Sequence, residues 1–308
     1  MTVDVVIPSY HPGEKFLKLL SRLEKQETPV NRIIVVNTEE KYWNPELYHG
    51  FSNLEVHHIS KSQFDHGAAR NMGISFSKAD IVVCMTDDAM PADHRLITSL
   101  LNGFTKQGPG GETVIEVYGR QLAGEDCGVA ERYTRQFNYP DQDRIKTIKD
   151  LDELGIKTYF ASNVCCAYRR ELFEELGGFI DKTIFNEDMI FAAKALKAGY
   201  AVCYAADARV VHSHNYTAFQ QLHRNFDLGV SQADHPDVFS GVPSEGEGIR
   251  LVKQTLKYLV EKRKILLIPG LIVNSGLKYT GYQLGKHYRR LPKKIVRQLS
   301  MNKNYWDR

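Results

Sequence analysis

The stretch VDVVIPSY, residues 3–10, is a run of mostly apolar, β-branched residues that ends in a proline and two polar side chains. A short apolar run of this kind is typical of a strand that is buried on both faces. The next residues, 13–26, place apolar side chains at the spacing of one helix face: Phe16, Leu19, Leu20 and Leu23. The beginning of the chain therefore predicts a strand followed by a helix, the repeating unit of a parallel sheet.

The same alternation of strands and helices continues along the first third of the chain. Further strands are expected at 32–38, 54–60 and 80–88, and further helices at 67–79 and 92–104. This order predicts an α/β fold with a mostly parallel sheet flanked by helices. In open parallel sheets, ligands collect at the carboxyl ends of the strands, where the polar residues of this chain also fall.

The overall composition is that of a globular protein. The chain has 308 residues, of which 43% are hydrophobic and 25% are charged. No run of about 18 apolar residues predicts a membrane-spanning helix, and no signal peptide is recognised at the start. The five cysteines form no CxxC pair, so a zinc site is not expected and a reduced, cytoplasmic protein is the simplest interpretation.

The net charge of +3 hides an asymmetry along the chain. Residues 249–308 hold 15 Lys and Arg against 2 Asp and Glu, whereas residues 1–248 hold 25 against 35. We expect a catalytic domain over residues 1–235, followed over 236–308 by a loop rich in Pro, Gly and Ser and by basic amphipathic helices.

The basic helices of residues 249–308 have two interpretations. They can lie on an anionic membrane surface, which would place the protein at the inner face of the cell membrane. Alternatively, they present a solvated positive face and pack against the catalytic domain. No nucleic-acid motif accompanies the charge, so nucleic-acid binding is not expected.

Two adjacent carboxylates, Asp87 and Asp88, end the predicted strand at 80–88. Strand side chains alternate, so at most one of the two is expected to reach a metal directly. Mg²⁺ or Mn²⁺ prefers such oxygen ligands, often with substrate phosphates completing the coordination shell. The alternative is a turn in which an aspartate caps the helix that begins near residue 92.

Two further polar pairs lie later in the chain. Glu187 and Asp188 stand in the first turn of a predicted helix, where acids complement the helix dipole, but one of them could instead act as a general base. His212 and His214 share one face of an alternating strand. That arrangement suits one cation or one diphosphate, although a single histidine is more often structural.

The stretch SQFDHGAARNMG, residues 62–73, is too rich in polar side chains for a core or an ordinary loop. Arg70 offers planar, permanently charged donors to a phosphate or to an anchoring carboxylate. Its alternative is a buried ion pair with Asp65 or Asp87. Asn71 could fix a loop or a hydroxyl, and His66 is interpreted as a solvated turn residue.

Taken in order, these segments resemble a known family. VVIPSY, IIVVN, HGAARNMG, TDDAMP, GGF with NED, and AGY resemble the inverting nucleotide-sugar glycosyltransferases of family 2, which have the GT-A fold. The similarity covers roughly residues 2–230. Within that family the segments FDHG and HSHNY are most similar to bacterial rhamnosyltransferases.

The resemblance implies a role for each matching residue. Asp188 would be the catalytic base, and Asp88 and His212 would hold Mg²⁺ or Mn²⁺, although Thr86 stands where the family's metal motif has its first acid. His214 and Glu187 would contact the diphosphate or the acceptor. The expected donor-binding residues are Pro8, Ser9, Tyr10, Asn37, Asp65, Gly67, Arg70, Asn71 and Asp87, with Asn37 in place of the usual acid.

The implied reaction is an inverting displacement at the anomeric carbon of a dTDP- or UDP-linked sugar. The resemblance favours transfer of L-rhamnose from dTDP-rhamnose to a glycan or lipid-linked acceptor in cell-surface polysaccharide synthesis. One alternative is a UDP-hexose or UDP-N-acetylhexosamine transferase of the same fold. A more remote alternative is a non-catalytic adaptor that binds sugar nucleotides.

Overall fold

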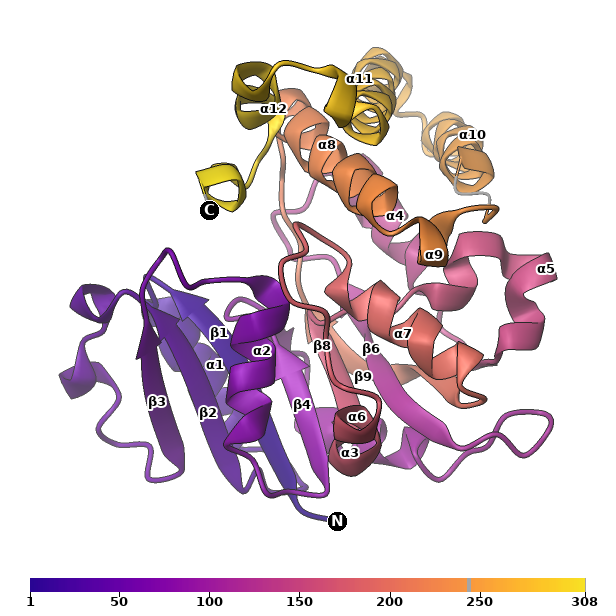
Figure 1. Cartoon of the computed structure of the whole chain (residues 1–308). Coiled ribbons are helices and arrows are strands. Elements are labelled where there is room, and N and C mark those ends of the chain that lie inside the picture. The colour runs from indigo at the N-terminus through magenta and orange to yellow at the C-terminus, as the bar shows by residue number, and fades with distance from the viewer. Residues whose placement is uncertain (243–244, 308) are drawn as a thin grey trace. The chain divides into compact units, whose positions relative to one another are not determined.

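The computed structural model describes residues 1–242 and 245–307, which form two compact units (Figure 1). Each unit is assembled from segments that are not contiguous in the sequence. The first comprises Met1–Leu122, Tyr139–Asp181 and Glu187–His212, and the second comprises Ala123–Asn138, Lys182–Asn186 and Ser213–Arg308. The boundary expected after residue 235 therefore falls inside the second unit.

The first unit is built on one sheet whose strand order is β3-β2-β1-β4-β8-β6-β9-β5, with β7 paired to β9. Its strands are β1 (Val3–Tyr10), β2 (Arg32–Thr38), β3 (Leu54–Ile59), β4 (Ile81–Met85), β5 (Met90–Pro91), β6 (Val114–Leu122), β7 (Arg144–Lys146), β8 (Cys165–Arg169) and β9 (Ala201–Val211).

The sheet is mixed, although the sequence predicted a mostly parallel one. The expected parallel part is present, because β3, β2, β1 and β4 pair in parallel in that order. Strand β8 then runs antiparallel to both β4 and β6, and β6 pairs in parallel with β9. The register places Ser9 opposite Asn37, so the polar ends of β1 and β2 lie at the same edge.

Helices cover both faces of this sheet. They are α1 (Glu14–Glu24), α2 (His66–Ser75), α3 (Leu96–Gly103), α5 (Leu151–Leu154), α6 (Arg170–Glu175) and α7 (Glu187–Lys197), with short 3₁₀ helices η1 (Glu40–Tyr42), η2 (Pro45–Leu47), η3 (Ile148–Asp150) and η4 (Gly155–Tyr159).

Alternate side chains of β1 pack against different helices. Val5 and Ile7 share an apolar cluster with Leu19 of α1. Val6 points to the other face, where its side chain lies 2.4 Å from the position that a Cβ on Gly73 of α2 would occupy. Helices α1 and α2 therefore cover opposite faces of the sheet, as Figure 1 also shows.

The second unit is helical. Its elements are α4 (Val129–Asn138), α8 (Ala218–Asp234), α9 (Pro236–Phe239), α10 (Glu245–Glu261), α11 (Ile268–Lys286) and α12 (Lys293–Leu299), with η5 (Ile265–Leu267), η6 (Tyr288–Arg290) and η7 (Lys303–Asp307). Within the part of the chain that the structure describes, no helix is both long enough and apolar enough to cross a bilayer.

Glycines allow α8 and α11 to pack with their backbones in close contact. A Cβ added to Gly281 would lie 2.2 Å from the Leu222 carbonyl oxygen, and one added to Gly285 would lie 2.1 Å from that of Phe226. Since real side chains do not approach this closely, only glycine fits at these two positions of α11.

We expect Gly285→Ala to lower the free energy of unfolding by about 1–3 kcal/mol, because the added methyl group overpacks the contact between α8 and α11. The measurement is the shift of the urea unfolding midpoint of the full chain. Gly276→Ala on the same helix is the control, because nothing lies within 4 Å of a Cβ added there. Alanine at 276 should be neutral or stabilising by up to about 1 kcal/mol. Equal destabilisation by both substitutions would contradict the close packing.

Candidate active site

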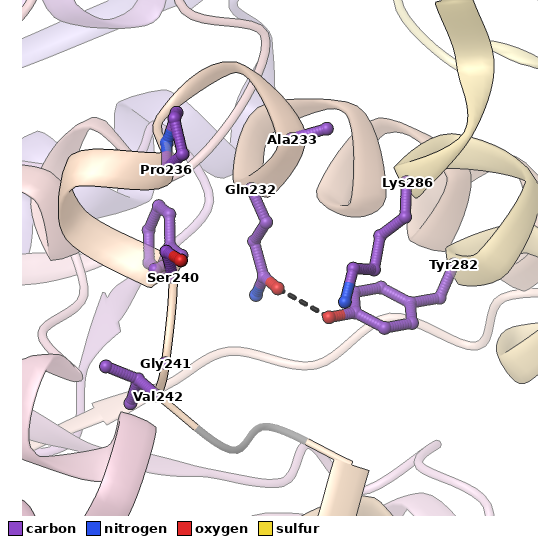
Figure 2. A pocket seen from close by; sticks show the side chains of 9 residues that line it. Gln232, Ala233, Pro236, Ser240, Gly241, Val242, Tyr282 and Lys286 are labelled. Carbon is purple, nitrogen blue, oxygen red and sulfur yellow. Dashed lines mark hydrogen bonds between the residues drawn. The ribbon is translucent and has the colours of Figure 1, made fainter. Parts of the chain in front are cut away.

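A cavity among the helices of the second unit does not contain the expected reacting groups. It measures about 480 Å³ and is lined by residues of α8, α9 and α11, among them Gln232, Phe239, Tyr282 and Lys286. Figure 2 shows the Tyr282 hydroxyl, which donates a hydrogen bond to Gln232 at 2.6 Å. None of its lining residues was predicted from the sequence as a site residue. All of the predicted site residues except His214 lie in the first unit.

The ends of β1, β2 and β3 are tied together by the buried amide of Asn37. Its Oδ1 accepts a hydrogen bond from the Ser9 hydroxyl at 3.2 Å, and its Nδ2 donates to the Glu39 carbonyl and to His58 Nδ1. Asn37 is fully buried, whereas the Tyr10 side chain at the end of β1 is 46% exposed. Tyr10 therefore presents a ring to solvent at the edge where the sheet's polar residues collect.

Asp87 follows β4 at this edge and contacts β1. Its Oδ2 accepts a hydrogen bond from the Tyr10 backbone N–H at 3.4 Å. Burial and then the neighbouring Asp88 carboxylate raise the pKa of Asp87 to about 6. The two carboxylates are thus close enough to repel one another. They lie in a turn after β4, because that strand ends at Met85 and not at residue 88 as the sequence predicted.

Asp88 lies beside His212, the residue that directly follows β9. Asp88 Oδ1 is 3.4 Å from His212 Nε2. The other ring nitrogen, Nδ1, is 3.1 Å from Oε1 of Gln121 in β6. Because the Gln121 amide nitrogen donates to Tyr139 and Ser162, its oxygen is the atom that faces His212. An N–H is therefore assigned to Nδ1, and Nε2 is the ring nitrogen that faces Asp88.

These two residues fit a divalent cation. Two ligand atoms at about 2.1 Å from one ion and at right angles to each other lie roughly 3 Å apart, which is close to the observed 3.4 Å. A metal-binding histidine typically donates its second N–H to an oxygen, as His212 does to Gln121. His214 follows two residues later and begins the second unit with Ser213.

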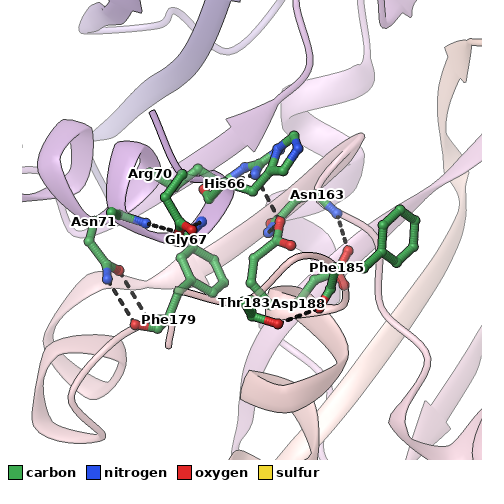
Figure 3. Close-up of polar contacts among 12 residues, drawn as sticks. His66, Gly67, Arg70, Asn71, Asn163, Phe179, Thr183, Phe185 and Asp188 are labelled. Carbon is green, nitrogen blue, oxygen red and sulfur yellow. Dashed lines mark hydrogen bonds and ion pairs between the residues drawn. The ribbon is translucent and has the colours of Figure 1, made fainter. Parts of the chain in front are cut away.

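The segment at 62–73 serves to hold other parts of the first unit in place (Figure 3). Asp65 caps α2, because its Oδ1 accepts hydrogen bonds from the backbone N–H groups of Gly67 and Ala68 at 3.1 Å. A Cβ on Gly67 would lie 2.2 Å from the Ile180 carbonyl oxygen. The glycine is therefore required by the close approach of the chain at Ile180.

Asn71 fixes the same later segment. Its Nδ2 donates to the Phe179 carbonyl at 2.8 Å, and its Oδ1 accepts from the Phe179 N–H at 3.0 Å, as Figure 3 shows. These paired bonds leave little freedom for the chain that leads from residue 177 to residue 181. Asn71 thus fixes a loop, which was one of the two roles expected for it.

Arg70 forms a buried ion pair with Glu187, a partner that the sequence did not indicate. Arg70 Nη1 is 2.8 Å from Glu187 Oε1, and the two side chains are only 5% and 8% exposed. The same guanidinium nitrogen also donates to the His66 carbonyl. Burial alone would raise the pKa of Glu187, but the Arg70 charge, with a smaller effect of His66, holds it below its usual value.

The pKa of Asp188, the next residue, is shifted in the opposite direction from that of Glu187. Asp188 Oδ2 accepts a hydrogen bond from the Asn163 backbone N–H at 3.0 Å, and its Oδ1 accepts from the Met189 N–H at 2.8 Å. Burial and then the charge of Glu187 raise its pKa to about 7. Two adjacent carboxylates with separated pKa values are typical of an acid–base site, in which one stays ionised and the other exchanges a proton.

Residues 162–164, immediately before β8, connect these groups. Ser162 accepts a hydrogen bond from Gln121, which orients His212. Asn163 donates from its backbone to Asp188 and from its side chain to Glu187. The Val164 carbonyl accepts from the N–H of Thr86, two residues before Asp88. The candidate base and the candidate metal ligands therefore belong to one hydrogen-bonded arrangement.

Comparison with known protein families identifies the family of this chain. The model of the family described as "Glycosyl transferase family 2" matches residues 4–177. The chain belongs to this family. It is a glycosyltransferase, as the sequence predicted.

Relatives of this glycosyltransferase match it along nearly its whole length. It is 37% identical to the O-antigen chain rhamnosyltransferase RfbN of Salmonella typhimurium, over 100% of this chain and 96% of that protein. It is 36% identical to the O-antigen chain rhamnosyltransferase WbaN of Salmonella anatum, over 98% of this chain and 95% of that protein.

Solved structures show the fold. The Pyrobaculum calidifontis mannosyltransferase PcManGT, in complex with GDP-Man and Mn²⁺, matches with a TM-score of 0.57 at 16% identity, over 99% of this chain and 84% of that one. A fragment of S. aureus TarS in complex with UDP-GlcNAc matches with a TM-score of 0.53 at 16% identity, over 94% and 92%. The expected GT-A fold is confirmed.

Sequence analysis missed Gln121 and Asn163 as parts of this glycosyltransferase's site. Both act through other residues, since Gln121 orients His212 and Asn163 holds Glu187 and Asp188. Asn163 precedes an apolar strand, and that position is the signal that could have pointed to it. Nothing in the local sequence distinguishes Gln121 from an ordinary strand residue.

We expect Arg70→Ala to destabilise the glycosyltransferase by about 3–5 kcal/mol, because it leaves the buried Glu187 carboxylate without its counter-charge. The measurement is the urea unfolding midpoint at neutral pH. Arg144→Ala is the control. Its side chain is 44% exposed and pairs with Glu153 and Asp150, and surface pairs contribute about 0–1 kcal/mol each.

The double substitution Arg70→Met with Glu187→Met separates the charge from the packing. Removing both charges should restore most of the stability lost in Arg70→Ala. If the double variant is as unstable as Arg70→Ala, the unpaired carboxylate is not the cause of the loss.

Proposed function

We propose that this glycosyltransferase moves L-rhamnose from dTDP-rhamnose to a glycan or lipid-linked acceptor in the synthesis of a cell-surface polysaccharide. The proposed donor and acceptor are inferred from the two relatives of 37% and 36% identity, which are named as O-antigen chain rhamnosyltransferases. The observation that carries the chemistry is the pair Glu187 and Asp188, in which one carboxylate is held ionised and its neighbour has a pKa of about 7.

Asp188 is the proposed general base. Its two backbone hydrogen bonds fix the carboxylate plane, and each oxygen keeps a further lone pair that can accept a proton. As the acceptor hydroxyl attacks the anomeric carbon, its proton passes to Asp188. The new glycosidic bond forms while the bond between that carbon and the diphosphate breaks, so the configuration inverts. Such proton transfer contributes about 10²–10⁴-fold to the rate.

Glu187 acts on the reaction through Asp188. Its ion pair with Arg70 keeps it ionised, and its charge helps to raise the pKa of Asp188 to a value useful near neutral pH. Gly67, Arg70 and Asn71, which were expected to line the donor pocket, are therefore proposed as positioning residues. They hold the segment that leads to the first turn of α7.

Donor binding is assigned to the edge formed by the ends of β1 and β4. The exposed ring of Tyr10 is the candidate contact for the nucleotide base, with Pro8, Ser9 and Asp87 around it. Asn37 supports this edge from the buried side, through its bonds to Ser9 and His58.

Asp88 and His212 are the proposed metal ligands, and His214 is close enough along the chain to join them or to reach the diphosphate, since its Cα is at most about 7 Å from that of His212. A bound Mg²⁺ or Mn²⁺ would neutralise charge on the leaving diphosphate. Gln121 contributes by holding the His212 ring so that Nε2 faces Asp88.

We also propose that residues 249–308 make peripheral contact with the inner face of the cell membrane. This segment has 15 Lys and Arg against 2 Asp and Glu. Anionic lipid headgroups attract such segments, and a lipid-linked acceptor would be presented at the same surface.

A donor screen tests the proposed substrate. We expect dTDP-L-rhamnose with Mn²⁺ or Mg²⁺ to raise the melting temperature more than UDP-glucose, UDP-galactose or UDP-N-acetylglucosamine, because only a ligand that binds the folded state stabilises it. Hydrolysis of each donor is measured in parallel. A larger shift and faster hydrolysis with a UDP sugar would replace the proposed donor, and binding without any turnover would favour an adaptor.

The pH dependence of turnover tests the proposed base. A base must be ionised to accept a proton, so kcat/KM should fall as pH decreases below about 7, the pKa of Asp188. Asp188→Asn should lower kcat by about 10²–10⁴-fold and leave donor binding in the thermal-shift assay intact. Asp207→Asn, an exposed carboxylate of β9, is the matched control. Unchanged turnover in Asp188→Asn would remove Asp188 from the mechanism.

A further inference from the structure

The outer side of the first half of α11 is apolar and exposed to solvent. Residues 265–277 contain no charged side chain. The exposed fractions of the large apolar residues at the start of α11 and in the preceding η5 are 59% for Ile265, 91% for Leu266, 58% for Ile272 and 56% for Val273. Tyr279, 57% exposed, continues the same side at helical spacing. We call these five side chains the outer stripe.

The opposite side of α11 packs inside the second unit, where Tyr282 is buried and Leu284 packs against an apolar cluster. Gly281 and Gly285 face the α8 backbone. Asn274 has a buried Oδ1 that lacks a hydrogen-bond partner among the described residues. The helix thus carries large apolar side chains on its outer side as well as on the side that faces the core, whereas an ordinary surface helix is polar on its outer side. An exposed apolar surface of this kind marks an interaction site.

Cations stand immediately before the outer stripe. Lys262, Arg263 and Lys264 directly precede Ile265 and are exposed, and Lys253 and Lys257 are exposed one and two turns earlier on α10. Residues 250–264 carry six Lys and Arg and one Glu. A concentrated positive charge therefore lies next to the outer stripe, which has no charged side chain.

We propose that the outer stripe inserts into the headgroup region of an anionic lipid bilayer, with the cations of residues 253–264 on the lipid phosphates. The inference deepens the membrane contact proposed above by assigning it to the corner between α10 and α11 (Figure 1). The span from Leu266 to Tyr279 is about 20 Å at 1.5 Å per residue. That length suits a helix lying along the interface, because the hydrocarbon core alone is about 30 Å thick.

Charge selects the bilayer over a second copy of the chain. In a symmetric dimer each outer stripe would face its own copy, which offers the adjoining cations few acidic partners, because residues 262–306 contain no Asp or Glu. An anionic lipid leaflet complements the two features together, because its acyl region accepts the apolar outer stripe and its headgroups attract the adjoining cations.

The test is co-sedimentation of the full chain with vesicles in the absence of any nucleotide sugar, so that it is independent of the proposed reaction. We expect binding to vesicles of phosphatidylglycerol and phosphatidylcholine, weaker binding to phosphatidylcholine alone, and weakening by added salt. Leu266→Glu should lower the affinity for these vesicles by about tenfold or more, because it puts a charge in place of an apolar side chain that would enter the bilayer.

Two matched controls separate this surface from general effects. Leu47→Glu changes a leucine of η2 that is 50% exposed in the first unit, and it should leave vesicle binding unchanged. Lys262→Glu with Lys264→Glu should weaken binding to anionic vesicles, whereas Lys15→Glu with Lys18→Glu on α1, which changes the net charge equally, should not.

Three results would overturn the proposal. The first is that the natural chain does not bind anionic vesicles. The second is that Leu266→Glu and Leu47→Glu bind equally well, although both keep the melting temperature of the natural chain. The third is a dimer in light scattering without lipid that Leu266→Glu dissociates, which would assign the outer stripe to a second copy. Loss of the fold in Leu266→Glu is addressed by Leu266→Ser, which should show a smaller loss of binding in the same direction.

Discussion

The turn at residues 162–164 is the constraint on which the site of the first unit depends. Three consecutive residues hold three different groups. Ser162 bonds the glutamine that orients His212, and Asn163 bonds the two carboxylates of α7. Val164 bonds the backbone at the end of β4. The turn leads directly into β8, which is hydrogen-bonded between β4 and β6 and cannot shift independently. A rigid central strand therefore sets the spacing between the proposed base and the proposed metal ligands, in keeping with the need of catalysis for groups held in place before the substrate arrives.

The buried ion pair between Arg70 and Glu187 divides the two adjacent carboxylates into different chemical states. A buried pair of this kind costs desolvation energy and is weak evidence for a contribution to stability. Its value lies in the charge it fixes, because an ionised Glu187 beside Asp188 raises the pKa of Asp188. If Glu187 were neutral, that contribution to the shift would be absent. The arrangement resembles other acid–base sites in which the environments of neighbouring carboxylates separate their pKa values.

Much of the fold followed from local sequence signals, since the β-branched run at 3–10 and the apolar spacing in 13–26 correspond to β1 and α1. The pairing of Asp88 with His212 was implied by the family resemblance alone, and the two side chains do lie side by side. What the sequence could not indicate were partners distant along the chain. Arg70 and Glu187 are 117 positions apart, and Gly67 is explained by the carbonyl of Ile180. The antiparallel strand β8 was equally hidden, because an apolar run carries no information on its direction in a sheet.

The chain passes between the two units at positions that adjoin the proposed reacting groups. Asn186 ends a segment of the second unit, and Glu187 and Asp188 follow it in the first; His212 ends a segment of the first unit. Asn186 has a positive φ of 67°, a conformation that asparagine tolerates, and its side chain donates to Ser231 of α8. The backbone immediately before α7 is thus held by the helix against which α11 packs.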